Sequence, residues 1–249
     1  MIVPGGSGGM NAWDELAELF ADDAGAVAAV PRLARHWELA QGSPEAGRLT
    51  AVEGAAAVRR QYAESLELLR LAEGFLAEGH AAVRYADIGS GGGWPGLVVA
   101  CARPGWEVHL VEPLQKRARF LDTAARELGC GNVTVHAARA EEAGRGPLRE
   151  TCALVTARAV AELRVVLEYT APLAAVGGII ALPKGSRLED ELAAAGAAMA
   201  ALGCELAGVA PMRPAVSETV RVAVFRKAAP CPAAYPRRPG VPERRPLGS

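Results

Sequence analysis

The stretch Asp87-Ile88-Gly89-Ser90-Gly91-Gly92-Gly93-Trp94-Pro95-Gly96 decides the fold of this chain. It follows a short apolar run, residues 83–86, that is typical of a strand, and it precedes residues 97–100, which are typical of a helix start. A strand, a glycine-rich turn and a helix form the first crossover of a doubly wound sheet. Glycines in such a turn let the backbone bend tightly and let a ligand approach the main chain.

The spacing of these glycines indicates which kind of ligand the turn binds. A dinucleotide site has the spacing G-x-G-x-x-G, but the last position of that pattern holds Trp94 here. The chain instead has G-x-G-x-G, at Gly89, Gly91 and Gly93, with the acid Asp87 two residues ahead. That arrangement is typical of S-adenosylmethionine sites, where the loop wraps a sulfonium amino acid and not a phosphate. We therefore predict S-adenosylmethionine as the cofactor, with Asp87, Gly89 and Gly91 in its site.

Length and composition predict one globular protein without a membrane span. With 249 residues, of which 51% are hydrophobic and 22% charged, the chain can bury one substantial core. No apolar run approaches the ~20 residues that cross a bilayer, and the five cysteines lack the spacing of a zinc site or a disulfide framework. We predict a cytoplasmic protein with reduced thiols, no metal and no membrane partner. Residues 1–9 are expected to be a disordered leader, which makes Met10 a possible functional start.

The hydrophobic pattern changes from helical to alternating near residue 83. Before it, apolar stripes at helical spacing in residues 13–40 and 58–75 predict helices, and after it strands alternate with helices. Such alternation specifies a mostly parallel sheet covered on both faces. Residues 211–217, between the last two strands, are too few for a crossover helix, so these strands should pair antiparallel. The predicted strands are 83–86, 106–112, 133–136, 153–156, 177–182, 204–210 and 219–225, with helices over 115–128, 161–173 and 188–202.

These elements predict an α/β fold, a doubly wound, Rossmann-like class I methyltransferase sheet. Five parallel strands end in a C-terminal antiparallel hairpin, and an N-terminal helical subdomain packs on the sheet. We divide the chain into four parts: the leader (1–9), the helical subdomain (10–82), the S-adenosylmethionine-binding methyltransferase domain (83–229) and a basic Pro/Arg-rich C-terminal tail (230–249).

Three further features fall at the carboxyl ends of the strands, where ligands bind in such a sheet. Glu112 ends the second strand, and its carboxylate can accept both ribose hydroxyls of a nucleoside. Ala140 and Glu141 follow the third strand, where a loop should cover the adenine ring, although Glu141 fits a helix N-cap neighbour equally well. Arg158 follows the fourth strand and should face the amino-acid end of the cofactor or the incoming substrate; the alternative is a surface ion pair.

Some methyl-transfer chemistries lack their residues in this chain. Methylation of an adenine or cytosine amino group usually needs an Asn/Asp-Pro-Pro-aromatic loop after the fourth strand, where this chain has residues 157–160, Ala-Arg-Ala-Val. Cytosine C5 methylation needs a cysteine nucleophile there, and neither Cys152 nor Cys231 is suitably placed. The sequence predicts no general base and therefore no catalytic residue. That favours a substrate atom that is nucleophilic when neutral, such as a ring nitrogen, for which positioning is the main requirement.

The C-terminal tail is basic and rich in proline. From Arg226 onward the chain has six basic residues and one acid. Arginines spaced by prolines can form an extended strap against phosphate groups, with Tyr235 available to stack on a base. A disordered, solvated tail has the same composition, so both interpretations stay open at this point.

Several blocks of the chain together resemble the RsmG (GidB) family, bacterial enzymes that methylate N7 of a guanine in 16S ribosomal RNA. The blocks are residues 87–97, Lys116-Arg117, Thr156-Ala-Arg-Ala-Val160, Pro183-Lys184-Gly185 and Tyr235-Pro-Arg-Arg-Pro-Gly-Val-Pro242. The resemblance implies cofactor contacts at Gly89, Trp94, Ala140, Glu141 and Arg158, and the 16S RNA or the small ribosomal subunit as partner. Trp94 stands where the family more commonly has Phe or Leu. The complete prediction is a cofactor site of Asp87, Gly89, Gly91, Trp94, Glu112, Ala140, Glu141 and Arg158, with RNA contacts at Lys184, Arg237 and Arg238.

Two other classes of function remain open on the sequence alone. A small-molecule or protein methyltransferase can use the same fold, although such substrates do not need the phosphate contacts that Lys184 and the basic tail would offer. An RNA-binding assembly factor could retain a non-catalytic cofactor fold, but the intact glycine loop and Glu112 count against it. A nicotinamide-dependent dehydrogenase is least favoured, because the third glycine is out of register.

Overall fold

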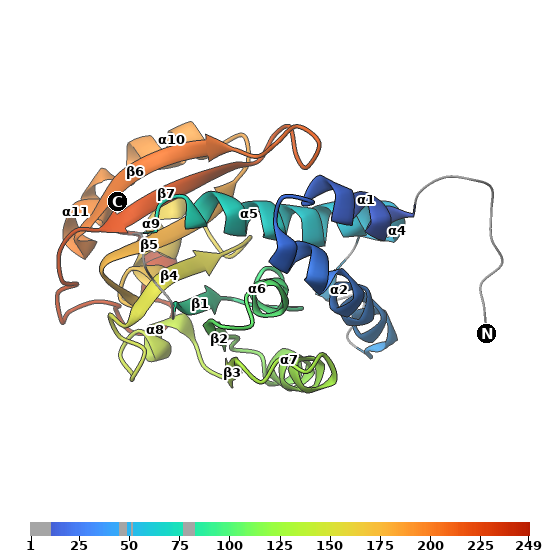
Figure 1. Ribbon diagram of the computed structural model, residues 1–249. Coiled ribbons are helices and arrows are strands. Elements are labelled where there is room, and N and C mark those ends of the chain that lie inside the picture. The colour runs from blue at the N-terminus through green and yellow to red at the C-terminus, as the bar shows by residue number, and fades with distance from the viewer. Residues whose placement is uncertain (1–10, 45–48, 51, 77–82) are drawn as a thin grey trace.

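The computed structural model describes residues 11–44, 49–50, 52–76 and 83–249. The predicted leader, residues 1–9, therefore lies outside the described residues. The strands form one mixed sheet in the order β3-β2-β1-β4-β5-β7-β6 (Figure 1). β1 to β5 are parallel, and β7 lies between β5 and β6 and runs antiparallel to both. The strands are β1 (Arg84–Ile88), β2 (Glu107–Val111), β3 (Val133–His136), β4 (Cys152–Ala157), β5 (Ala174–Lys184), β6 (Cys204–Pro211) and β7 (Arg221–Lys227).

Helices cover both faces of the sheet, and the predicted α/β fold with its C-terminal hairpin is confirmed. The N-terminal helices are α1 (Ala12–Leu19), α2 (Ala24–Gly42), α4 (Gly54–Ala57), the π-helix η1 (Val58–Ala63) and α5 (Glu64–Glu73). The later helices are α6 (Gly96–Ala102), α7 (Gln115–Glu127), α8 (Ala140–Ala143), α9 (Leu163–Thr170), α10 (Leu188–Ala194), α11 (Gly196–Leu202) and α12 (Val241–Arg244). No helix in the described part of the chain is long and apolar enough to cross a bilayer.

Alternation along the strands divides the buried side chains into two cores. Successive strand residues point to opposite faces, so Leu154 lies in the core that contains the N-terminal helices, α6 and α7. Its neighbour Val155 lies in the core beneath α8 to α11. The helix predicted over 188–202 is interrupted at Ala195, immediately before Gly196, a residue with low helix propensity.

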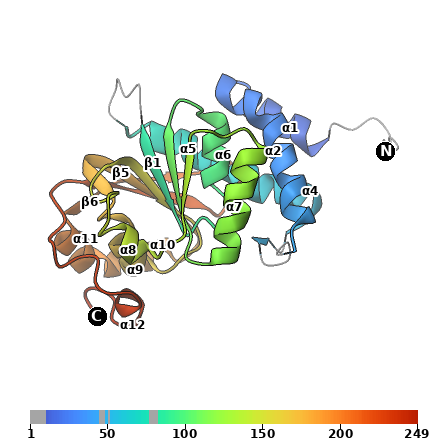
Figure 2. The same cartoon turned by 90° about the horizontal axis from the view of Figure 1, so that it is seen from below.

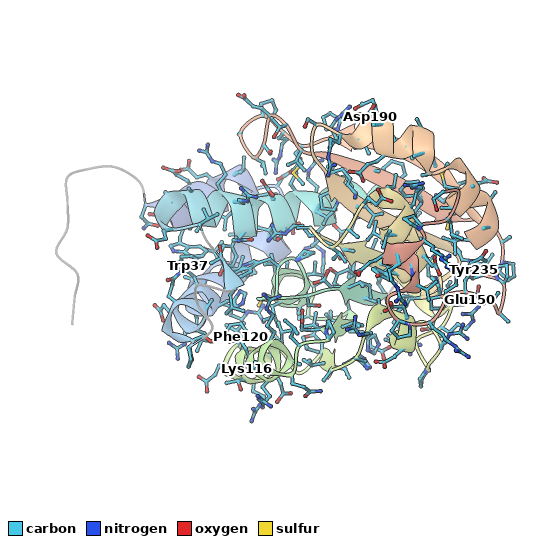
Figure 3. All side chains as sticks on the ribbon, turned by 180° about the vertical axis from the view of Figure 1, so that it is seen from behind. Trp37, Lys116, Phe120, Glu150, Asp190 and Tyr235 are labelled. Carbon is cyan, nitrogen blue, oxygen red and sulfur yellow. The ribbon has the colours of Figure 1, made fainter. Side chains whose placement is uncertain are left out.

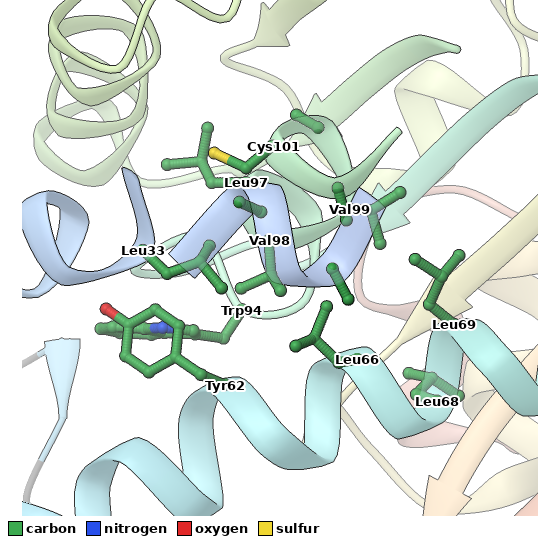
Figure 4. Close-up of a cluster of buried hydrophobic side chains, with 14 of the residues drawn as sticks. Leu33, Tyr62, Leu66, Leu68, Leu69, Trp94, Leu97, Val98, Val99 and Cys101 are labelled. Atoms are coloured by element: carbon green, nitrogen blue, oxygen red, sulfur yellow. The ribbon is translucent and has the colours of Figure 1, made fainter. Parts of the chain in front are cut away.

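The N-terminal helices share their core with the sheet. Figure 4 shows side chains from α2, α5 and α6 in one buried cluster, with Leu33, Leu66 and Val98 among them. Arg103, at the end of α6, adds a charged link, because its guanidinium contacts Asp23 and Glu73 at 2.6 Å each. The predicted helical subdomain therefore packs tightly on the glycine-loop helix α6.

The C-terminal tail is neither an extended strap nor a solvated chain. It packs beside α9, on the face of the sheet opposite the N-terminal helices. α12 and the C-terminus lie beside α9, away from α1 and α2 (Figure 2), and Tyr235 and Glu150 both lie on the side of the molecule opposite Trp37 (Figure 3). Arg149 donates hydrogen bonds to the carbonyl oxygens of Tyr235 (2.8 Å) and Cys231 (2.7 Å). Arg237 pairs with Glu168 at 2.6 Å, and that carboxylate is completely buried.

Replacing Arg237 with Ala should destabilise the fold, because it leaves the buried Glu168 carboxylate without its counter-charge. Loss of one partner of a buried ion pair typically costs about 3 kcal/mol. The neighbouring Arg238 is exposed, so Arg238→Ala is the matched control and should change the free energy of unfolding by less than about 0.5 kcal/mol. Urea denaturation measures both. Adding Glu168→Gln to Arg237→Ala should recover part of the lost free energy of unfolding. If Arg237→Ala and Arg238→Ala were equally stable, this account of the tail would be wrong.

Candidate active site

The glycine loop turns at the carboxyl end of β1 and is tied to β2. Gly89, Gly91 and Gly93 have φ values of +71°, +56° and +96°, a region that favours glycine. The backbone N–H groups of Gly89 and Ser90 both donate to the carbonyl oxygen of Val111, at 2.9 and 3.2 Å. The predicted turn is therefore present, and its main chain has the conformation that only glycines adopt without strain.

Two buried carboxylates, Asp87 and Glu112, stabilise this loop by accepting hydrogen bonds from its backbone. The Asp87 carboxylate accepts hydrogen bonds from the Gly96 N–H (3.1 Å) and the Thr156 hydroxyl (3.0 Å). The Glu112 carboxylate accepts from the N–H groups of Gly91 and Leu114, at 2.9 Å each. Asp87 thereby joins β1, β4 and the start of α6, while Glu112 holds the middle of the loop against the end of β2. In this arrangement the acids predicted to bind the cofactor contact the loop backbone.

Burial raises the pKa of Asp87 to about 7, despite the hydrogen bonds from Thr156 and Gly96 and the nearby positive charge of Arg158. Since the folded-state pKa lies above the ordinary value of 3.8, folding favours the protonated acid. The contribution of protonated Asp87 to the free energy of unfolding is therefore complete below about pH 4, and it is lost as the pH rises through about 7.

Asp87→Asn should therefore become relatively more stable as the pH rises. The free energy of unfolding of the wild-type protein minus that of the variant should decrease between about pH 4 and pH 8. The decrease should be at most about 4 kcal/mol, because one pKa unit corresponds to about 1.4 kcal/mol. Urea denaturation of both proteins across this range measures the difference. A difference that does not vary with pH would show that Asp87 is ionised throughout.

A cleft of about 910 Å³ opens in front of the loop, between the sheet and the N-terminal helices. It lies over the ends of β1, β4 and β5, where the strand order reverses, which is where ligands bind in sheets of this kind. Several segments of the chain line it. Among them are the glycine loop, residues 157–162 at the end of β4, residues 183–185 at the end of β5, and Arg60, Gln61 and Glu64 from the N-terminal helices.

Arg158 links the sheet to the N-terminal helices within this cleft. Its guanidinium donates to the Arg60 carbonyl oxygen (2.8 Å) and to the Gln61 side-chain oxygen, and it lies 3.8 Å from the Glu64 carboxylate. Burial lowers the pKa of Arg158. The next residue, Ala159, has φ +56°, a conformation that is rare without glycine and that concentrates at functional sites. Arg158 is thus a cleft residue, with an exposed side-chain fraction of only 18%.

The cleft brings together five of the predicted site residues and leaves out six. Those that line it are Gly89, Gly91, Trp94, Arg158 and Lys184. Asp87 and Glu112 are buried and accept hydrogen bonds from the backbone next to the cleft, Ala140 and Glu141 begin α8, and Arg237 and Arg238 belong to the packed tail. The Glu141 carboxylate accepts a hydrogen bond from the Gly240 N–H at 3.0 Å, so it fixes the tail. Lys184 donates to Glu191 and to the Ala161 carbonyl oxygen, at 2.8 Å each.

Trp94 and His36 connect the glycine loop to α2. The Trp94 ring lies in an aromatic cluster, with centroid distances of 5.0 Å to His36 and 5.9 Å to Tyr62. His36, expected to be an ordinary partly buried residue, is completely buried and contacts the Gly92 carbonyl oxygen through Nε2 at 2.8 Å. Burial lowers the pKa of His36 to about 4, so it is neutral at physiological pH.

Sequence reasoning missed Gln61 and Glu64 as site residues. The stripe of apolar positions in this segment predicts an ordinary helix, whereas residues 58–63 form a π-helix, a feature frequent at functional sites. The π-helix precedes Glu64 and carries Gln61 into the cleft. The apolar stripe contains no signal for this change of helix type.

Gly89→Ala should reduce S-adenosylmethionine affinity at least about tenfold while leaving the fold intact. A Cβ at this position would lie 2.8 Å from the Val160 side chain, at a φ of +71° that alanine rarely adopts. This strain, of about 1–3 kcal/mol, falls on two of the segments that line the cleft. Isothermal titration calorimetry measures the affinity, and Gly105→Ala is the control, since its Cβ would meet nothing within 4 Å. Unchanged affinity in a folded Gly89→Ala protein would contradict the placement of the cofactor.

The reversed strand order, the glycine turn and the cleft define a methyltransferase that uses S-adenosylmethionine. The family model of rRNA small subunit methyltransferase G matches residues 39–215. A ribosomal RNA small subunit methyltransferase G from Roseiflexus castenholzii is 45% identical over 183 residues, which cover 73% of this chain and 77% of the relative. The chain belongs to the rRNA small subunit methyltransferase G family.

Other comparisons agree with the family and with the fold. The relative from Symbiobacterium thermophilum is also 45% identical, over 66% of this chain and 70% of its own. The crystal structure of MtNAS in complex with MTA and tNA superimposes with a TM-score of 0.53 at 16% identity, over 87% of this chain and 76% of its own. A geranyl diphosphate methyltransferase in complex with GPP and sinefungin gives 0.51 at 19% identity, over 76% and 84%. At these identities the two structures support the fold alone.

Proposed function

We propose that this protein transfers the methyl group of S-adenosylmethionine to N7 of a guanine in 16S ribosomal RNA. Membership of the rRNA small subunit methyltransferase G family supports the RNA substrate. The observation that carries the proposed chemistry is the composition of the cleft wall. Among the described residues that line it there is no cysteine and no histidine, which disfavours covalent attack on a pyrimidine ring and a histidine general base. A neutral guanine N7 needs neither, because its lone pair is available without deprotonation.

The residues present fit the cofactor. The left-handed glycine turn offers open main chain, and a Cβ at Gly89 would intrude on Val160. S-adenosylmethionine supplies an electrophilic methyl group on a sulfonium. Gly89 and Gly91 would contact it along the turn, and Glu112 would keep the turn in place, with lone pairs left for a ribose hydroxyl. Arg158 would position the carboxylate of the cofactor or the substrate base, and Ala140 with Glu141 would border the adenine.

The cleft would act mainly by orienting the two reactants and excluding water. The N7 lone pair would form the new bond to the methyl carbon while the carbon–sulfur bond breaks and leaves its electron pair on the sulfur. No proton moves in this step, in agreement with the absence of a predicted general base. The N-terminal helices close one side of the cleft through Gln61 and Glu64 and thereby limit the access of water.

RNA contacts are also part of the proposal. Arg238 is exposed at the start of the turn before α12 and is available to a phosphate. Lys184 and Arg237 already pair with Glu191 and Glu168, so a phosphate would have to share or replace those carboxylates. A protein that acts on the small ribosomal subunit would work in the cytoplasm.

The test of this function is to map the methyl group. The protein should be incubated with isotopically labelled S-adenosylmethionine and 16S RNA, as free RNA and as the small subunit. Nucleoside mass spectrometry and chemical cleavage at 7-methylguanosine then identify the atom and the position. We expect label at one guanine N7, and at least tenfold less with Gly89→Ala. Label on another atom, or only on proteins or small molecules, would contradict the proposal, and RNA binding without turnover would favour an assembly factor.

A further inference from the structure

Glu64 is a carboxylate in the cleft that accepts no hydrogen bond from the residues that the structure describes. It is the first residue of α5, directly after the π-helix, and its side chain is only 16% exposed. Its closest charged partner is Arg158, at 3.8 Å, which is too far for a hydrogen bond. No hydrogen bond within the described part of the chain satisfies this carboxylate, and burial raises its pKa.

Arg158 does not neutralise Glu64 at close range because its guanidinium has other partners. It donates to the Arg60 carbonyl oxygen and to Gln61, both on the π-helix. The Glu64 oxygens therefore keep their acceptor capacity inside a partly closed cleft. A carboxylate in this situation is costly for the fold, and a ligand that donates two N–H groups would offset the cost.

Guanine has two such donors on the edge remote from its N7. The N1–H and the exocyclic N2 amino group lie side by side on the Watson–Crick edge, and a carboxylate can accept from both. Methyl transfer also moves the positive charge from the sulfonium to the purine ring. A negative group on that edge stabilises the product-like transition state more than the neutral base.

We propose that the Glu64 carboxylate binds the N1–H and N2 amino groups of the target guanine, selecting guanine and stabilising the positive charge that forms on its ring. This inference rests on the proposed N7 transfer. It assigns recognition of the base to the N-terminal helices, across the cleft from the glycine loop.

The experiment compares wild-type protein with Glu64→Gln on RNA that carries guanosine or inosine at the target position. Inosine keeps N7 and N1–H but lacks the exocyclic amino group. Glu15→Gln is the control variant, since Glu15 is an exposed acid on the neighbouring helix α1. Single-turnover rates, S-adenosylmethionine affinity by calorimetry, and melting temperatures are measured for each protein.

We expect wild-type protein and Glu15→Gln to methylate inosine about tenfold more slowly than guanosine. Glu64→Gln should lose about 10- to 100-fold in rate on guanosine, the usual effect of losing a hydrogen bond to a charged group. It should discriminate little between the two bases and bind the cofactor within about twofold of wild type. Glu64→Asp should recover part of the rate.

Two results would overturn the inference while leaving the proposed function in place. The first is equal methylation of guanosine and inosine at N7 by the wild-type protein, a measurement that does not depend on the folding of any variant. The second is a loss of cofactor affinity in Glu64→Gln that accounts for its lost rate, which would place Glu64 at the ammonium group of the cofactor. If the wild-type protein forms no 7-methylguanosine, the proposed function fails and the inference fails with it.

Discussion

The Asp87 carboxylate makes the interaction on which the site depends. One oxygen accepts from the first N–H of α6, at Gly96, and the other accepts from Thr156 on β4, so one buried side chain joins three elements. These are the elements on both sides of the point where the strand order reverses. Tyr85 extends the network, because its hydroxyl lies 2.6 Å from that of Thr156. Asp87, two residues before the first glycine of the loop, is therefore needed for the shape of the glycine turn, whether or not it also contacts a ligand.

The N-terminal helices complete the site as well as the core. His36 holds the glycine loop from one side, through the Gly92 carbonyl oxygen, and Arg158 joins the π-helix to the end of β4 on the other. The His36 contact is buried and the Arg158 contact is more exposed, but both are polar and directional, so each fixes a geometry that apolar packing alone would leave less defined. The sheet positions the glycine turn, while the N-terminal helices form one wall of the cleft in front of it and so limit which ligands can enter.

Local patterns were enough to predict the sheet, because strand alternation and the glycine spacing depend on neighbouring residues. The strand predicted over 133–136 is the observed β3, and the antiparallel hairpin follows from a connection too short for a helix. Contacts between distant segments were not predictable in this way. The pairing of Arg237 with Glu168 spans 69 positions, and that of Arg158 with Gln61 spans 97. Such pairs explain why the sequence alone could not show that the tail is packed, or that Arg237, predicted as an RNA contact, is already paired.

The charges in the cleft suit a reaction that moves a positive charge without creating one. Arg158 comes from the end of β4 and Glu64 from the start of α5, so each charge is held by a different part of the fold. Their separation of 3.8 Å is short enough for mutual stabilisation in a partly buried site and too long for a hydrogen bond that would occupy both groups. During methyl transfer the sulfonium loses its positive charge and the base gains one. The net charge in the cleft between Arg158 and Glu64 therefore does not change. The cleft therefore needs no proton exchange with solvent during transfer, and the N-terminal helices can shield one side of it without interrupting the chemistry.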